Sequence, residues 1–528
     1  MENIIDLPIE QELHLYRWQR ECLSAWDRHG CRGIVQAVTG SGKTRLAVAA
    51  IRLLRRRCPS LSIKVVVPTI PLASQWMDIL TAYASSEEER PGLVGNGYSG
   101  ADSRRTRIYI INSARKQFLP DLRSALARDF SVLAVFDECH HYLSKENRTI
   151  FAYAGEPYAD RVFALGLSAT LDAGEMHFPF NALGDTIYSY HAEEAVQDAV
   201  VSPYFISNIS VPFLPKERRE YDAQSLRIRH TLGRLYKQYP YLKAFTDQKQ
   251  AFMKEVSGIA NAKKMDPSDP AAAFLLLTYE RKKLCVMADV RIRCCLDLIR
   301  ALPENDRILV FSERIEQAEN LQRTLMRHFG SCVGIYHSAI TKAARNRILT
   351  EYKNHTIRIL IACRCLDEGI DIPDANIGIV LSSSSVPRQR IQRLGRILRR
   401  AAGKDAACLY YLYLRDASED NVYLSPETDR ALSSHLRYEP SDGSFRNELY
   451  LYTAGVYLSE VRDRLTPGEL AELRVCIEEG VTRSDYLLPA DILKEKKAHA
   501  EDRHARNYWT VMQAIEKRME IHSQETGK

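Results

Sequence analysis

Three separated groups of residues have the types and spacing that phosphate chemistry requires. Residues 37–44 read Ala-Val-Thr-Gly-Ser-Gly-Lys-Thr, a glycine-rich loop that ends in Lys43 and Thr44. In such a loop, backbone N–H groups surround phosphate oxygens at a helix N-terminus, the lysine reaches the β- and γ-phosphates, and the Thr44 hydroxyl holds Mg²⁺. The residues expected to bind a nucleoside triphosphate are therefore Thr39, Gly40, Ser41, Gly42, Lys43 and Thr44.

The second group is Asp137-Glu138-Cys139-His140, which begins 94 residues after Lys43 and follows the apolar run 132–136. A carboxylate at the end of a buried strand would emerge beside the phosphate loop, so we expect Asp137 to hold Mg²⁺ through water. Glu138 would then orient or deprotonate the attacking water. The alternative is a pair of solvated acids that cap a helix.

The third group, residues 392–399, reads Gln-Arg-Leu-Gly-Arg-Ile-Leu-Arg. Three- and four-residue spacing places most of its polar side chains on one helical face. From a second domain these cations could close over the same nucleotide. The alternative is a solvated basic helix.

The elements that would position these groups alternate between short β-rich runs and helix-length amphipathic stretches from residue 33 to residue 169, which indicates βαβ units and a parallel sheet. Residues 34–38 are expected to form the strand before the phosphate loop, and residues 45–57 the helix after it. The other expected strands are 63–67, 107–111, 132–136 and 162–167. Each ends before a polar cluster, where ligand-binding loops lie in open α/β sheets.

A second alternating block begins near Arg307 and has no phosphate loop of its own. Its expected strands are 308–312, 332–336, 357–362, 377–381 and 407–414. One loop in two similar halves is the arrangement that a nucleotide site at a domain interface needs.

With Asp137-Glu138-Cys139-His140 in the place of the DEAH-type box, the chain resembles the superfamily 2 helicases and translocases. The box, the long Gln-Arg motif of residues 392–399 and the short motor core resemble the XPB, UvrB and type I restriction branch more than the DEAD-box branch. The resemblance implies an α/β fold of two tandem RecA-like parallel-sheet domains, with a helical insertion and a mostly helical C-terminal extension. It also implies a nucleic-acid-dependent ATPase, with ATP and Mg²⁺ as cofactors, that acts as a DNA helicase or translocase and hydrolyses ATP between the two domains.

The same resemblance assigns roles to individual residues. The expected catalytic residues are Lys43, Asp137, Glu138, Gln392 as a γ-phosphate sensor, and Arg396 and Arg399 as arginine fingers. Gln19 would read the adenine, or else belong to an aromatic-rich helix that packs on the core; Gly369 and Asp371 would face the nucleotide. The residues expected to couple ATP state to nucleic acid are His140, Ser168 and Thr170. The expected nucleic-acid contacts, which could instead be ordinary capped turns, are Pro68, Thr69, Asn112, Ser113, Ser312, His337 and Ser338.

The remaining segments suggest four regions. The expected domains are an ATP-binding domain at 1–205, a helical insertion at 206–304, a second RecA-like domain at 305–418 and an accessory, mostly helical region at 419–528. Tyr236, Tyr239 and Tyr241 of the insertion could line a nucleic-acid path, because aromatic rings stack on bases. A plain amphipathic bundle is the alternative.

Composition limits the classes of protein. The 528 residues carry a net charge of +6, which permits nucleic-acid binding without requiring it. No apolar tract approaches the roughly 18 residues that a spanning helix needs, and the twelve cysteines contain no Cys-x-x-Cys pair. We therefore expect a cytoplasmic protein without membrane association, with reduced thiols and no cysteine metal site.

DNA is the expected partner rather than RNA. The C-terminal region has no nuclease constellation, so a protein partner would supply nuclease or targeting activity if DNA is cut in the pathway of this protein. The alternative function is an ATP-controlled nucleic-acid clamp or scaffold subunit of a repair, restriction or anti-phage defence complex, without processive unwinding.

Overall fold

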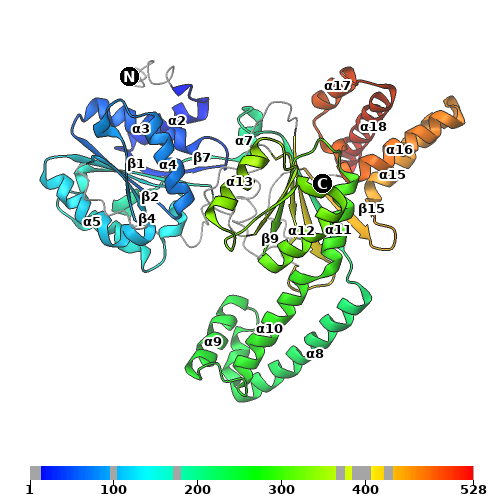
Figure 1. Cartoon of the computed structure of the whole chain (residues 1–528), viewed down its shortest axis with the longest axis horizontal. Coiled ribbons are helices and arrows are strands. Elements are labelled where there is room, and N and C mark those ends of the chain that lie inside the picture. Colours follow the sequence, from blue (N-terminus) through cyan, green and yellow to red (C-terminus); the bar gives the residue numbers. More distant parts are fainter. Residues whose placement is uncertain are drawn as a thin grey trace. The chain divides into compact units, whose positions relative to one another are not determined.

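The computed structural model describes residues 13–95, 104–169, 180–363, 375–382, 406–420 and 432–526. The chain divides into two compact units, one formed mainly by residues up to Pro203 and the other mainly by residues from Tyr204 onward. Each unit has its own sheet (Figure 1). The expected α/β class with two parallel-sheet domains is confirmed.

Within the described residues, the sheet of the first unit has seven strands, and every neighbouring pair is parallel. Across the sheet, the strands are β3 (Gly92–Val94), β4 (Thr106–Ile110), β2 (Leu61–Val67), β5 (Ser131–Phe136), β6 (Val162–Ser168), β1 (Arg32–Ala37) and β7 (Thr186–Tyr190). The inner strands are almost completely buried, as parallel strands covered on both faces must be.

The helices of this unit follow the strands in the βαβ order expected from the sequence. They are α2 (Arg17–Arg28), α3 (Lys43–Arg57), α4 (Ile70–Ala82), α5 (Ile111–Ala127), α6 (Phe180–Leu183) and α7 (Ala192–Gln197). The Trp18 ring of α2 stacks on Tyr190 of β7 with ring centroids 4.8 Å apart, which fixes α2 against the edge of the sheet.

The second sheet has eight strands in the described residues. Across the sheet they are β10 (Val333–Tyr336), β11 (Ile359–Cys363), β9 (Ile308–Ser312), β12 (Ile377–Val380), β13 (Ala407–Leu414), β8 (Tyr204–Val211), β14 (Leu432–Glu439) and β15 (Ser444–Arg446). β14 is parallel to β8, and β15 returns antiparallel to β14. β8, β14 and β15 are not among the strands expected from the sequence.

Four helices of the second unit follow β8 in the sequence and precede β9. They are α8 (Pro215–Gln238), α9 (Lys249–Ala262), α10 (Pro270–Met287) and α11 (Asp289–Ala301). α8, α9 and α10 form an arm that extends away from the second sheet (Figure 1) and has an apolar core of its own. Tyr236 and Tyr239 pack against this core, whereas Tyr241 is exposed. Two of the three tyrosines considered for a nucleic-acid path therefore belong to the packing of the bundle.

The remaining helices cover the second sheet or follow it. They are α12 (Ile315–Phe329), α13 (Lys342–Lys353), α15 (Glu448–Val461), α16 (Pro467–Arg483), α17 (Ala490–Ala498) and α18 (Arg503–Thr526). The helical character expected of the C-terminal extension is thus confirmed. In the part of the chain that the structure describes, every helix is too short or too polar to cross a membrane.

A buried arginine connects α11 to the second sheet. Arg291 Nη1 donates to the carbonyls of Leu381 and Leu412 at 2.7 Å each. Its Nε donates to the Cys285 carbonyl at 2.9 Å, and its Nη2 pairs with Asp420. Both charged side chains are buried, so water cannot replace either partner if the other is lost.

Replacing this arginine tests the connection. We expect Arg291→Ala to lower the free energy of unfolding by about 3–5 kcal/mol, because it leaves the Asp420 carboxylate buried and unpaired. Arg293→Ala, on the exposed side of the same helix, should stay within about 0.5 kcal/mol of the parent protein. Urea unfolding followed by circular dichroism measures both, and equal stability of the two variants would contradict this account.

Candidate active site

The phosphate loop connects β1 to α3 and depends on two glycines. Gly40 and Gly42 have φ angles of 88° and 94°, in the left-handed region that glycine favours. Gln19 is buried next to the loop, and its Nε2 donates to the Gly42 carbonyl at 2.9 Å. Its Oε1 accepts from the Tyr16 backbone N–H at 2.9 Å. Gln19 therefore stabilises the loop, and its contact with adenine stays a prediction.

The loop has donors that a phosphate could use. Lys43 Nζ donates to the Ala37 carbonyl at 3.0 Å and so lies folded over the loop. The Ser41 hydroxyl donates to the Val38 carbonyl at 2.7 Å. The Thr39 hydroxyl is buried without a hydrogen-bond partner among the described residues, and the N-terminus of α3 has no side-chain cap. Unsatisfied donors at a helix N-terminus fit a phosphate group.

Asp137 follows β5 and is held by two donors. Trp76 Nε1 donates to Oδ2 at 2.8 Å, and the Glu138 backbone N–H donates to Oδ1 at 3.0 Å. Burial raises the pKa of Asp137, whereas Trp76, Lys43 and the Glu138 N–H act in the opposite direction. The effect of Lys43 agrees with the strand order β5, β6, β1, which places the phosphate loop near this carboxylate. A buried carboxylate beside a phosphate loop fits the oxygen ligands that Mg²⁺ prefers.

The side chains of His140 and Ser168 connect Glu138, the residue after Asp137, to the end of β6. Glu138 has a φ of 46°, a left-handed conformation that is uncommon for a residue with a Cβ and frequent at functional sites. His140 Nδ1 lies 3.5 Å from Glu138 Oε2 and 3.0 Å from Ser168 Oγ, at the end of β6. The structure therefore brings Glu138, His140 and Ser168 together.

The expected nucleic-acid residues of the first unit lie at the same edge of the sheet as the phosphate loop. Pro68 and Thr69 follow β2, and Asn112 and Ser113 begin α5 directly after β4. β2 and β4 are parallel neighbours, so their carboxyl ends bring the two segments together. The buried Thr69 hydroxyl has no hydrogen-bond partner in the described part of the chain. Contact with nucleic acid stays a prediction for these residues.

The expected residues of the second unit differ in exposure. Ser312 is buried at the end of β9, where its hydroxyl donates to Gln317 Oε1 at 2.7 Å. His337 is also buried, whereas Ser338 is exposed after β10. Ser338 is therefore the residue of this group that a ligand can reach without rearrangement.

Six expected site residues lie outside the described residues, and their roles stay predictions. They are Thr170, Gly369, Asp371, Gln392, Arg396 and Arg399.

Trp76 and Tyr142 stabilise the acidic motif by hydrogen bonds to Asp137, a role that was not expected from the sequence. The Trp76 indole is buried, and its Nε1 donates to Asp137 Oδ2. Tyr142 donates its hydroxyl proton to the Asp137 backbone carbonyl at 2.7 Å. A buried indole N–H usually has a hydrogen-bond acceptor, so the sequence could have predicted a hydrogen bond for Trp76. It could not have predicted that Asp137 is the acceptor.

Two protein-family models match the chain. The model described as "Type III restriction enzyme, res subunit" matches residues 12–173, and the model described as "Helicase conserved C-terminal domain" matches residues 291–401. Together they cover about half of the chain and include the phosphate loop, the acidic motif and the Gln-Arg motif.

Related proteins agree with these models. The "DNA 3'-5' translocase XPB2" of Sulfurisphaera tokodaii is 27% identical over 406 residues, which are 76% of this chain and 82% of the relative. The "DNA 3'-5' helicase XPB" of Kineococcus radiotolerans is 23% identical, over 74% of this chain and 58% of its own length. The helicase domain of Pyrococcus furiosus Hef has a similar fold, with a TM-score of 0.51 and 16% identity over 79% of this chain and 99% of that structure.

Trp76 provides a test of the Asp137 site. Trp76→Phe keeps an aromatic ring but removes the N–H that donates to Asp137, so we expect the half-saturating Mg²⁺ concentration for nucleotide hydrolysis to rise about 10-fold. Trp26→Phe is the matched control, because that buried indole donates to the Ala164 carbonyl, away from the acidic motif. An unchanged Mg²⁺ requirement in Trp76→Phe, or an equal change in both variants, would show that the Trp76 hydrogen bond does not contribute to Mg²⁺ binding at Asp137.

Proposed function

Because the chain is a superfamily 2 helicase or translocase of the XPB and type I restriction motor kind, we propose that it couples ATP hydrolysis to movement on DNA. The observation that carries the proposal is the pairing of the phosphate loop with Asp137. Lys43 influences the Asp137 carboxylate electrostatically, and Glu138 follows it in an uncommon backbone conformation. A triphosphate on the loop would thus lie beside a metal-binding acid and a base.

The chemistry proposed for the first unit uses its own residues. Mg²⁺ would neutralise phosphate charge when bound by Thr44 and Asp137. Lys43 would leave the Ala37 carbonyl and turn to the β- and γ-phosphates, while Glu138 orients the attacking water. The roles expected of Gln392, Arg396 and Arg399 remain part of the proposal.

DNA is proposed as the substrate because both XPB relatives are named as DNA 3'-5' enzymes. Two side chains at the carboxyl ends of β4 and β2 support hydrogen bonds to the phosphate backbone of DNA. They are the exposed Asn112 and Thr69, whose hydroxyl has no hydrogen-bond partner among the described residues. Eleven cysteines of the described residues are free thiols, which supports a reducing, cytoplasmic location. A protein partner with nuclease or targeting activity also remains part of the proposal.

Glu138→Gln tests the hydrolytic role. The variant should bind ATP with parental affinity but lose turnover by about 10²–10⁴-fold, because an amide cannot accept the proton of water. Glu146→Gln, an exposed substitution nearby in the chain, should keep parental turnover. Equilibrium binding of a fluorescent ATP analogue and a phosphate-release assay measure the two steps. Normal phosphate release by Glu138→Gln would remove this residue from the proposed role.

Ser168→Ala tests coupling. The change removes the hydroxyl that hydrogen-bonds to His140 Nδ1, so we expect strand displacement or movement per ATP to fall roughly 5–10-fold, the effect of a hydrogen bond of about 1–1.4 kcal/mol. DNA-stimulated hydrolysis should remain near the parental rate. Ser24→Ala, which removes a hydroxyl bonded only within α2, should change neither quantity. A parallel loss of hydrolysis and movement in Ser168→Ala would show that Ser168 serves catalysis rather than coupling.

A further inference from the structure

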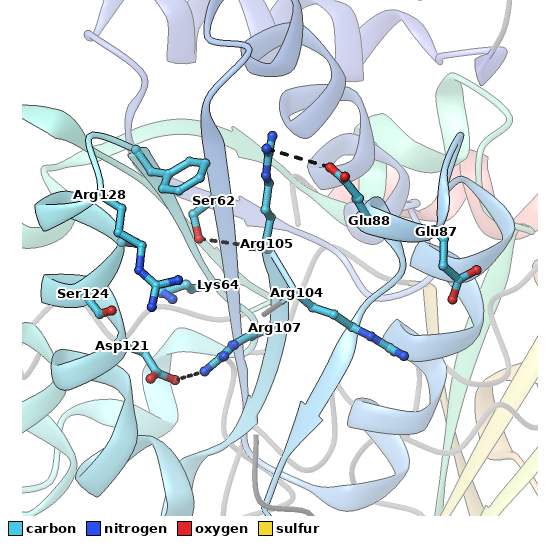
Figure 2. A pocket seen from close by; sticks show the side chains of 12 residues that line it. Ser62, Lys64, Glu87, Glu88, Arg104, Arg105, Arg107, Asp121, Ser124 and Arg128 are labelled. Carbon is cyan, nitrogen blue, oxygen red and sulfur yellow. Dashed lines mark hydrogen bonds and ion pairs between the residues drawn. The ribbon is translucent and has the colours of Figure 1, made fainter. Parts of the chain in front are cut away.

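The first unit contains a pocket of about 590 Å³ between the amino ends of β2 and β4 and the C-terminal half of α5. This volume falls within the roughly 300–1,000 Å³ of small-molecule sites. In Figure 2 the side chains of Lys64, Asp121, Arg107 and Arg128 gather at one side of the pocket, while Arg105 extends toward Glu88.

The pocket lies away from the phosphate loop. The strands of the first sheet are all parallel, so their carboxyl ends meet at one edge and their amino ends at the other. The phosphate loop, Asp137 and Thr69 follow carboxyl ends, whereas the lining residues Ser62 and Arg107 lie in the amino-terminal halves of β2 and β4. A ligand in this pocket therefore occupies a site separate from the proposed ATP site.

Positive charge exceeds negative charge along the pocket. Five basic and three acidic side chains line it. Asp121 is already engaged, because it accepts from Arg107 Nη1 at 2.8 Å and from the Tyr109 hydroxyl at 2.7 Å. Lys64 and the exposed Arg128 add two further cations beside this group. The side of the pocket with Lys64 thus has three cations to one carboxylate.

Lys64 is the feature that a structural role explains least well. Its side chain lies in the middle of β2 and is only 2% exposed, and burial lowers the pKa of its ammonium group to about 8. Within the described residues, its ammonium group makes a long hydrogen bond of 3.4 Å to the Tyr109 hydroxyl and lies 5.8 Å from the centre of the Tyr109 ring, and the charge of Asp121 partly counteracts the effect of burial. A buried ammonium group is costly unless it is paired and hydrogen-bonded. Because the Asp121 carboxylate already accepts from Arg107 and Tyr109, an anion in the pocket would supply Lys64 with a partner of its own.

Arginine is suited to the recognition of phosphate. Its planar guanidinium donates two parallel hydrogen bonds to phosphate oxygens, whereas a lysine ammonium acts as a point charge. Arg107 and Arg128 supply two such groups, and the Arg105 guanidinium lies over the Phe130 ring at 5.1 Å, which positions it at the pocket wall. We propose that this pocket binds a small phosphate-bearing molecule with at least two negative charges, at Lys64, Arg107 and Arg128.

Pyrophosphate is a suitable probe for the shared phosphate chemistry. Isothermal titration of the full chain carrying Lys43→Ala, which removes the lysine of the phosphate loop, should show one remaining pyrophosphate site. Adding Lys64→Met or Arg128→Ala should weaken that binding at least 10-fold, the factor that corresponds to about 1.4 kcal/mol. Lys64→Met keeps the side-chain volume, and Arg128 is on the surface, so Arg128→Ala remains informative if Lys64→Met does not fold.

Arg123→Ala is the matched control. It removes a guanidinium from α5, five residues before Arg128, but this guanidinium pairs with Glu156 outside the pocket. Its pyrophosphate affinity should equal that of the Lys43→Ala parent. Absence of a site in Lys43→Ala, undiminished binding in both pocket variants, or an equal loss in Arg123→Ala would overturn the proposal. It would also fall if Arg128→Ala weakened binding of single-stranded DNA but not of pyrophosphate, since the pocket would then be a nucleic-acid contact.

Discussion

The buried carboxylate of Asp137 is the constraint on which the first unit depends. A carboxylate at the end of an apolar strand loses its hydration, and burial raises its pKa. Trp76 and the Glu138 N–H counteract that effect with hydrogen bonds, and Lys43 does so with its charge. The order β5, β6, β1 in the parallel sheet makes this possible, because it brings the ends of these strands to one edge.

Runs of mostly apolar residues explain why the buried strands could be predicted from the sequence. β2 and β9 are mostly apolar strands that are buried along their whole length, and both agree closely with the expected strands, although β2 also buries Lys64. The phosphate loop and the acidic motif were likewise identifiable, because their chemistry depends on neighbours in the chain. Sequence reasoning therefore placed the phosphate loop after β1 and the acidic motif after β5, where the structure has them.

Contacts between distant segments explain what could not be predicted. β8 finds its partner β14 more than 200 residues later, where the Ser207 and Ser434 hydroxyls meet at 2.7 Å. The Trp76 indole reaches Asp137 across 61 positions of sequence. β7 has mostly exposed or half-buried side chains and therefore lacks the apolar pattern of a parallel strand. None of these pairings has a local signal.

The central claim is that DNA stimulates ATP hydrolysis at the Lys43 and Asp137 site. The most direct measurement is the ATP hydrolysis rate of the full chain alone and with single-stranded DNA, double-stranded DNA or RNA of equal length. The account predicts slow hydrolysis alone and a several-fold increase with DNA that Lys43→Ala abolishes. An equal rate with and without DNA, or stimulation by RNA alone, would contradict it.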